Sequence, residues 1–277
     1  LLKPIVLNLR KKFYKQIKIK DDDSDDMKII TIEDYIKNNI SSDENALSED
    51  ADKIEHIVKT KIGSRFGVTK LFVGLLEKAG LKSQIVFPSK RNDLQIDETF
   101  ENYHLIDDLI LYFPATGNFM DPIDISYRYP FHNPYFGGTR GLFLKSTSLG
   151  EFKTAIASFD TIPLQPLEKN FTNMNVDVKF NDNLDSLLMH VKESWSGYAA
   201  SNYRPIYNYL PKDKQEEVSK EIFKSVGASD NITNIKVENN SMADGIKDNP
   251  LFLSADIVTG GLTENAGKKI LVKLGEM

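Results

Sequence analysis

The chain has 277 residues, a formal net charge of −5 and a composition that is 40% hydrophobic. This length and apolar content suffice for one large globular domain or two smaller ones. The acidic balance argues against general nucleic-acid binding, because phosphate contacts require clustered cationic surface. The chain has no cysteine, which excludes disulfides, thiolate metal sites and thiol chemistry.

The amino-terminal region predicts neither a membrane span nor a signal peptide. No run approaches the roughly 18 apolar residues that cross a bilayer, and Leu1-Leu2-Lys3 does not have the shape of a signal sequence. The chain does not start with methionine, so we expect a processed protein or an internal piece of a larger one. Residues 1–29 are expected to form a helical lead-in, with the basic run 10–20 and the acidic run 21–26 as solvated faces.

Helical patterns dominate the first eighty residues. Apolar side chains recur at helical spacing over 71–79 and are followed by Gly80 in the helix-stop position. This segment is expected to be the central buried helix. Shorter helices are predicted over 5–19, 31–36 and 49–60.

Strand patterns follow the central helix. They cover 83–88, 103–113 and 118–121, separated by polar loops. An order of helix followed by three strands favours an α+β domain, with helices packed on one face of an antiparallel sheet, over a doubly wound fold. We place this domain at residues 30–152.

A second domain, β-rich and also of the α+β class, is predicted at residues 153–277. It ends after a strand-like segment, so further strands are expected beyond the end of the chain. Its elements are a hairpin (175–181 and 187–193), a helix (205–226) and strands over 232–237, 251–258 and 270–274.

Three short segments have the order of a catalytic frame. Gly63-Ser64-Arg65 opens the buried helix, Tyr103-His104-Leu105 begins a strand, and Asp121-Pro122 follows another. Thiol nucleophiles lie at helix N-termini, where the dipole lowers the thiol pKa, with a histidine nearby and an acid that orients the imidazole. The order of the segments would bring the three positions together, but the helix starts with Arg65.

These segments resemble the transglutaminase-like superfamily. Residues 63–81, GSRFGVTKLFVGLLEKAGL, are similar to the family's G-D-C-K-D-K-A-x-L-L-x-x-L-L-x-x-x-G-I helix, most closely in the Leu-Leu-x-x-x-Gly-Leu portion. Residues 102–104 resemble the family's N-H-V strand start, and residues 120–124 its L-D-P-T-D segment. The resemblance covers about residues 30–150 and implies a papain-like core, followed by a β-rich domain.

The resemblance implies that His104 is the general base and Asp121 the acid that orients it, with Arg65 in place of the cysteine. A guanidinium stays protonated and cannot act as a nucleophile. Ser64 precedes it by one residue and would point about 100° away around a helix. The site is therefore expected to be inactive in acyl transfer. The alternative is an active hydrolase or acyl-transferase that uses Ser64 with His104 and Asp121.

Arg65 has three possible arrangements. A cation at a helix N-terminus is disfavoured by the dipole, so Arg65 could turn to solvent. It could instead form an internal salt bridge that closes the cleft, with Asp121 or a loop carboxylate. In the third arrangement Arg65 and His104 bind an anionic or carboxylate-bearing partner. The candidate loop carboxylates are Asp107, Asp108 and Asp124.

The segment 127–138 is dense in aromatic residues and leaves two interpretations open. It packs as an ordered loop over the core, or it forms a recognition surface, since rigid aromatic residues and arginine often anchor partners. The candidate binding residues there are Arg128, Tyr129 and Tyr135.

No metal or cofactor is expected. The Asp22-x-Ser24-x-Asp26 run has the spacing of a calcium loop with Glu33, but Met27 occupies the position that requires glycine. His56, His132 and His190 lack the paired spacing of a zinc site.

The sequence thus predicts a non-catalytic transglutaminase-like module of a larger exported bacterial protein, which binds a protein, peptide or glycan. A structural spacer between domains is a further alternative. A location in the cell envelope or periplasm is implied by the family resemblance. The ligand and the oligomeric state are left open.

Overall fold

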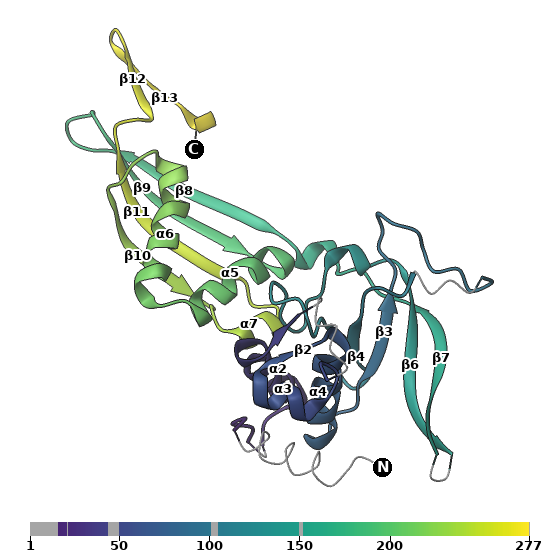
Figure 1. Ribbon diagram of the computed structural model, residues 1–277. Coiled ribbons are helices and arrows are strands. Elements are labelled where there is room, and N and C mark those ends of the chain that lie inside the picture. Colours follow the sequence, from purple (N-terminus) through teal and green to yellow (C-terminus); the bar gives the residue numbers. More distant parts are fainter. Residues whose placement is uncertain (1–15, 21, 44–49, 101–104, 150–151, 277) are drawn as a thin grey trace. The chain divides into compact units, whose positions relative to one another are not determined.

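The computed structural model describes residues 16–276 except 21, 44–49, 101–104 and 150–151. The chain divides into two compact units, Leu1–Leu164 and Gln165–Met277 (Figure 1). The sequence predicts a boundary after residue 152. The second unit begins later because residues 152–161 form a strand of the first unit, which pairs with the preceding strand over 140–149.

In the described part of the first unit, three helices form one layer. The first, α2 (Asp25–Asn39), starts earlier than the predicted 31–36, because the Ser24 side chain caps it by accepting from the Met27 amide. It is followed by α3 (Ile54–Thr60) and α4 (Arg65–Lys78). Figure 1 shows these helices gathered beside the sheet of the same unit.

Helix α4 is the central buried helix that the apolar pattern predicts. It packs closely at its start, where a side chain on Gly67 would lie 2.5 Å from the Ala51 carbonyl oxygen. It ends next to Gly80, whose φ of +82° suits glycine. Its fully buried apolar side chains are Leu71, Phe72, Leu75 and Leu76.

The sheet of the first unit has five antiparallel strands in the order β5-β4-β3-β6-β7. Together with the helices it gives the predicted α+β class. The strand predicted over 103–113 begins only at Ile110, and the long pair β6–β7 was not predicted. The strands are β3 (Gln84–Pro88), β4 (Ile110–Phe113), β5 (Asn118–Met120), β6 (Arg140–Leu149) and β7 (Phe152–Thr161); a short parallel pair joins β1 (Ser41–Ser42) to β2 (Ile62–Gly63).

The second unit has a four-stranded antiparallel sheet in the order β10-β11-β9-β8. The predicted hairpin is β8–β9, and β11 inserts between β9 and β10. The strands are β8 (Thr172–Phe180), β9 (Leu187–Trp195), β10 (Ile232–Glu238) and β11 (Leu251–Thr259), with a separate hairpin of β12 (Thr263–Ala266) and β13 (Lys269–Val272).

Helices cover one face of this second sheet. The single helix predicted over 205–226 is two helices, α5 (Gly197–Tyr209) and α6 (Lys212–Gly227), because the chain is extended at Leu210 and Pro211. A capping box at Ser241 starts α7 (Met242–Ile246). The core beneath them is formed by inward residues of β9 and β11 together with Ala200, Tyr207, Phe223 and Val226.

Short 3₁₀ turns are η2 (Pro134–Phe136), η3 (Leu167–Lys169) and η4 (Leu274–Glu276). Among the helices of the described residues, none combines the length and the apolar character needed to cross a membrane.

Candidate functional site

The start of helix α4 uses the hydroxyl of Ser64 for two structural bonds. Ser64 Oγ accepts a hydrogen bond from the Gly67 amide at 3.0 Å, which caps the helix. The same hydroxyl donates to the carboxylate of Asp52. The proton of Ser64 is therefore directed at a carboxylate, and no described imidazole accepts it.

Arg65 is the first residue of α4 and reaches the segment 107–108. Its Nη1 donates to the Asp107 carbonyl oxygen at 2.6 Å, and its Nη2 lies 3.5 Å from Asp108 Oδ1. The Nζ of Lys90 lies 2.5 Å from the other oxygen of Asp108. The first turn of α4 contains no acidic residue, so Asp108 brings a negative charge to the positive end of the helix. Of the three arrangements considered for Arg65, the structure has the internal salt bridge.

Asp121 follows β5 directly and is buried. Its Oδ1 accepts hydrogen bonds from the amides of Ile123 at 2.8 Å and Asp124 at 2.9 Å, which closes a turn. Burial raises the pKa of this carboxyl group, while the amide bonds and the charge of Lys37 act in the opposite direction. His104 lies outside the described residues, so its pairing with Asp121 stays a prediction.

A second histidine, His132, lies within electrostatic range of Asp121. Its Nδ1 is 2.9 Å from the Asn133 carbonyl oxygen, an atom that can only accept, so Nδ1 carries the proton. The ring lies 5.5 Å from that of Phe119 and 6.0 Å from that of Phe136. Burial lowers the pKa of His132, and the charge of Asp121 opposes this effect. The sequence alone does not predict this proximity, because the only signal is a histidine eleven residues after the aspartate in an aromatic loop.

The loop after Asp121 is held to helix α2 by buried charges. The Nζ of Lys37 lies 2.9 Å from Glu33 Oε1, and both side chains are at most 2% exposed. The same ammonium donates to the carbonyl oxygens of Asp124 at 2.8 Å and Tyr127 at 2.7 Å. Glu33 Oε2 accepts from the Tyr129 amide at 2.8 Å. This network makes α2 the support of the loop.

Tyr129 and Arg128 belong to the interior, so at these two residues the structure has the loop packed over the core and not the recognition surface. The Tyr129 side chain is 1% exposed, and its hydroxyl donates to Asp26 Oδ1 at 2.5 Å. Burial and the bond to Asp26 raise the pKa of Tyr129. Arg128 is buried and lies 3.6 Å from the Asp34 carboxylate. Of the three candidates in this loop, Tyr135 is the exposed one.

The first unit has a hollow of about 670 Å³ near the C-terminal end of α4. It lies between Val73 on the helix and Leu144 and Ala155 on β6 and β7. Its walls come from the opposite end of α4 to Arg65, so it is not the cleft of the predicted catalytic frame.

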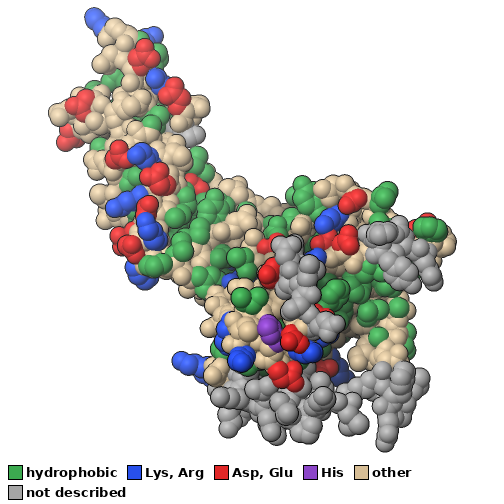
Figure 2. Space-filling model, viewed as in Figure 1, with side chains coloured by type: hydrophobic (Ala, Val, Ile, Leu, Met, Phe, Trp, Pro, Cys, Tyr) green, Lys and Arg blue, Asp and Glu red, His purple; other side chains and the backbone are tan. Residues whose placement is uncertain are grey.

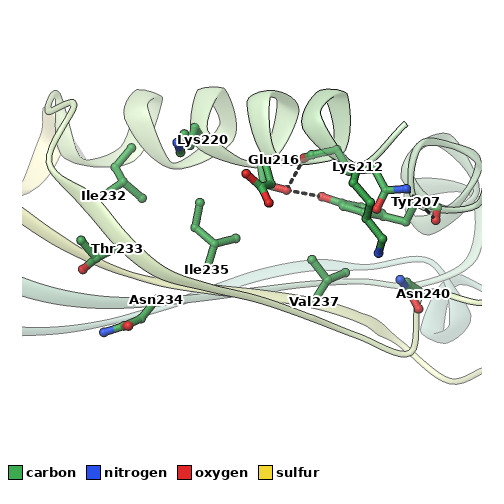
Figure 3. A pocket seen from close by; sticks show the side chains of 12 residues that line it. Tyr207, Lys212, Glu216, Lys220, Ile232, Thr233, Asn234, Ile235, Val237 and Asn240 are labelled. Atoms are coloured by element: carbon green, nitrogen blue, oxygen red, sulfur yellow. Dashed lines mark hydrogen bonds between the residues drawn. The ribbon is translucent and has the colours of Figure 1, made fainter. Parts of the chain in front are cut away.

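A pocket of about 440 Å³ lies in the second unit between α6 and β10. Figure 3 shows Ile232, Ile235 and Val237 pointing from the strand toward the helix. The helix contributes Lys212, Gln215, Glu216, Ser219 and Lys220, while Tyr207 and Asn240 close one end. The hydroxyl groups of Tyr207 and Ser219 are 3.0 Å apart and join α5 to α6. The charged side of α6 thus lines a pocket, a role that a helix pattern alone does not reveal.

The described residues contain no group of three or more His, Cys, Asp or Glu side chains that could hold a metal ion. This finding includes the Asp22 to Glu33 segment, where α2 begins inside the spacing of the calcium loop.

Comparison with known families gives the class of the first unit. Residues 11–114 match the family model of the transglutaminase-like superfamily. No curated protein and no solved structure matches the chain. The chain therefore carries a transglutaminase-like core, as the sequence resemblance implies. The matched range includes Ser64, Arg65 and His104 and ends before Asp121.

Proposed function

We propose that this protein is a non-catalytic member of the transglutaminase-like class that binds a protein or peptide. The observation that carries this proposal is the arrangement of Arg65 at the start of α4, with its guanidinium held by Asp107 and Asp108. That position belongs to the nucleophile in the family that the sequence resembles. A guanidinium has no nucleophilic lone pair at accessible pH.

The rival function is a hydrolase or acyl-transferase that uses Ser64. For this, Ser64 would have to release both the Gly67 amide and the Asp52 carboxylate. Losing the cap alone costs the helix about 1 kcal/mol, and His104 would still have to reach the hydroxyl. The bonds of Ser64 therefore support the non-catalytic function.

The proposed binding site is the pocket between α6 and β10. Its strand side offers the apolar side chains of Ile232, Ile235 and Val237 beside the polar Thr233 and Asn234. Its helix side offers two lysines, Lys212 and Lys220, on either side of Glu216. Within the described part of the chain these three charged groups form no hydrogen bond or ion pair. Its volume lies in the range of ligand pockets, which combine apolar walls with a few polar groups. This chemistry favours a peptide that inserts an apolar side chain and carries a nearby carboxylate.

Figure 2 shows basic and acidic side chains interspersed on the face of the second unit where Figure 1 draws α6. The alternation of sign favours a defined ligand over general attraction to a polyanion.

On the family resemblance alone, we propose that the protein is part of a larger exported chain of a bacterial cell envelope. A structural spacer is the second candidate function. The guanidinium of Arg65 is already paired with Asp108 at the start of α4, so it is not needed to bind a partner there.

The catalytic question is tested with a panel of amide and ester substrates. Wild type, Ser64→Ala and His104→Ala are compared at equal concentration, and we expect no turnover above the buffer rate in any of them. A turnover that disappears in both variants would overturn the non-catalytic function. A separate variant, Arg65→Cys, tests whether His104 and Asp121 can still activate a nucleophile. If they can, the pKa of the introduced thiol is expected to be lowered.

The binding question is tested by selecting displayed peptides on the intact protein. The selected peptides are then titrated against wild type and the double variant Lys212→Glu, Lys220→Glu. We expect acidic, apolar peptides whose affinity falls at least tenfold in the double variant. The matched control is Lys214→Glu, because Lys214 lies on the same helix but pairs with Glu217 and does not line the pocket. Selected peptides that bind the double variant as well as wild type would favour the spacer.

A further inference from the structure

Among the described residues, strand β8 pairs with β9 alone and so forms an edge of the sheet in the second unit. It pairs with β9 over nine consecutive residues, Thr172–Phe180, in unbroken register. Its sequence, TNMNVDVKF, contains no proline and a single lysine. Long and regular edge strands are rare in natural sheets, because they present unpaired amide and carbonyl groups to other chains.

The opposite edge of the same sheet is protected. The pairing of β10 with β11 shifts register between Thr233 and Lys236. Asn234, within the shift, has a φ of +54°. Bulges of this kind bend an edge and interrupt its pairing groups. The contrast within one sheet indicates that β8 is an edge that meets a partner strand.

The side chains of β8 also indicate a partner. Met174, Val176, Val178 and Phe180 lie opposite Glu193, Val191, Met189 and Leu187 of β9, so they share the face that the helices cover. Yet Met174 is 43% exposed, and Val178 and Phe180 are each 37% exposed. In Figure 2 hydrophobic side chains gather beside α6, where Figure 1 draws β8 and α5. We call these four residues the β8 shelf.

We propose that the β8 shelf is the contact surface for a second copy of this chain, with the two β8 strands antiparallel about a two-fold axis at Val176. This pairing joins two four-stranded sheets into one of eight strands. Met174 of each copy meets Val178 of the other, and the two Val176 side chains meet at the axis. Apolar cross-strand pairs of this kind stabilise a sheet by about 0.2–1 kcal/mol each.

The charges of β8 fit a second copy. With the axis at Val176, Asp177 faces Asn175 and Lys179 faces Asn173, so no like charges oppose each other. Moving the axis to Asp177 would place that carboxylate against its own copy, which is destabilising. A two-fold contact requires a surface that complements itself. Val176 is the centre of Thr172–Phe180, so an axis there pairs all nine residues of the strand with the second copy.

Single cysteines test this geometry, since the chain has none of its own. Val176→Cys places a thiol on the axis. Opposed residues of antiparallel strands have Cα atoms about 4.5–5.5 Å apart, within the range of about 4.4–6.8 Å that a disulfide needs. We expect mild oxidation to give a cross-linked dimer. The matched control is Leu188→Cys, 43% exposed on the other face of β9, where we expect no dimer above random collision.

The register is tested by mixing two variants. Met174→Cys mixed with Val178→Cys is expected to cross-link far more than either variant alone, because the two positions oppose each other only in the proposed register. Equal cross-linking of the single variants and the mixture would overturn it.

The oligomeric state of the full chain is measured by sedimentation. Val178→Lys puts a cation on the shelf and is expected to raise the dissociation constant of the dimer at least tenfold, or about 1.4 kcal/mol. Leu188→Lys is the matched control and should leave the dimer intact. Fluorescence of Trp195, buried in the core of this unit, verifies that the variants fold. A wild-type chain that sediments as a monomer at all accessible concentrations, or dimers equally weakened by both lysines, would overturn the proposal.

Discussion

The first unit contains a buried ion pair between Glu33 and Lys37, whereas the second unit leaves the apolar side chains of β8 at its surface. Glu33 and Lys37 are almost fully enclosed, and the residues of the predicted catalytic frame that the structure describes serve as caps, turns and ion pairs. In the second unit, the charged side chains of Lys212, Glu216 and Lys220 line the α6–β10 pocket. The exposed apolar side chains lie on the β8 shelf. We therefore look for contacts with other molecules in the second unit.

This comparison can be tested because the units have separate reporters. Trp195 is the single tryptophan of the chain and lies in the core of the second unit. Its fluorescence follows that unit, while far-UV circular dichroism follows both. Urea unfolding is expected to show two transitions, of which one moves with Trp195.

The largest effect is expected for Lys37→Met. It leaves Glu33 buried without its counter-charge and two carbonyl oxygens without their donor. Removing one partner of a buried ion pair costs about 3–5 kcal/mol. The transition without a tryptophan signal should shift to lower urea. Lys53→Met, at an exposed pair with Asp50, should shift neither. A Trp195 transition that moves equally with Lys37→Met would contradict the independence of the units.

Gly197→Ala is the corresponding change in the second unit, and it is expected to move the Trp195 transition instead of the other one. Gly197 has a φ of +56°, and a side chain there would lie 2.5 Å from the Lys169 carbonyl oxygen. Strain and overlap together should cost about 2–3 kcal/mol, read as a shift of the Trp195 transition. Gly267→Ala has a similar φ of +67° but open space around it, so about 1 kcal/mol is expected. Equal shifts for the two variants would show that the overlap with the Lys169 carbonyl oxygen does not reduce the free energy of unfolding.

A pH dependence of the first unit is expected from His132. Burial lowers its pKa below the ordinary value of 6.5, so in acid the unfolded chain binds a proton that the folded chain does not. Stability is therefore fully present above pH 6.5 and lost as the pH falls below it. The raised pKa of Asp121 has the opposite sign: the folded state gains stability as the pH falls through that pKa.

The measurement compares the urea midpoints of wild type and His132→Phe at about pH 7.5 and about pH 5.5, on either side of an ordinary histidine pKa. The loss of stability in acid should be smaller in the variant. His190→Phe, at an exposed pair with Asp256, should leave the dependence of the first unit unchanged. An identical acid loss in His132→Phe would assign it to other groups.

The smallest effect is expected for Arg65→Gln. The Arg65 side chain is 32% exposed, so its ion pair is screened by solvent and should contribute at most about 1 kcal/mol. The difference from wild type should shrink further in salt. A loss comparable to that of Lys37→Met would place Arg65 among the buried structural charges instead.

The elements that the sequence predicts best are those whose apolar pattern is complete. Helix α4 has an unbroken buried stripe, and the β8–β9 hairpin alternates clearly. The pair β6–β7 was missed because β7 is an edge strand with few buried side chains, so its sequence lacks the alternation of a half-buried strand. The break between α5 and α6 was missed although Pro211 stands at it, since the helical pattern of Lys212–Gly227 follows that of Gly197–Tyr209 almost directly.

The sequence predicts where the residues of the candidate site lie along the chain, but only some of the contacts that they make. Sequence spacing places Ser64 and Arg65 at the start of α4 and includes Asp108 among the possible partners of Arg65. It could not show that Arg128 and Tyr129 are buried, because their partners lie on α2, about a hundred residues earlier. Contacts of this range depend on how the loop packs, which local pattern does not encode.

The strand order of the second unit has a consequence during protein synthesis. Strands β8 and β9 leave the ribosome first, but the neighbour of β9 in the sheet is β11, which comes after both long helices and β10. The sheet cannot close until Thr259 has emerged. At about 5–20 residues per second, the hairpin waits several seconds with both of its edges open.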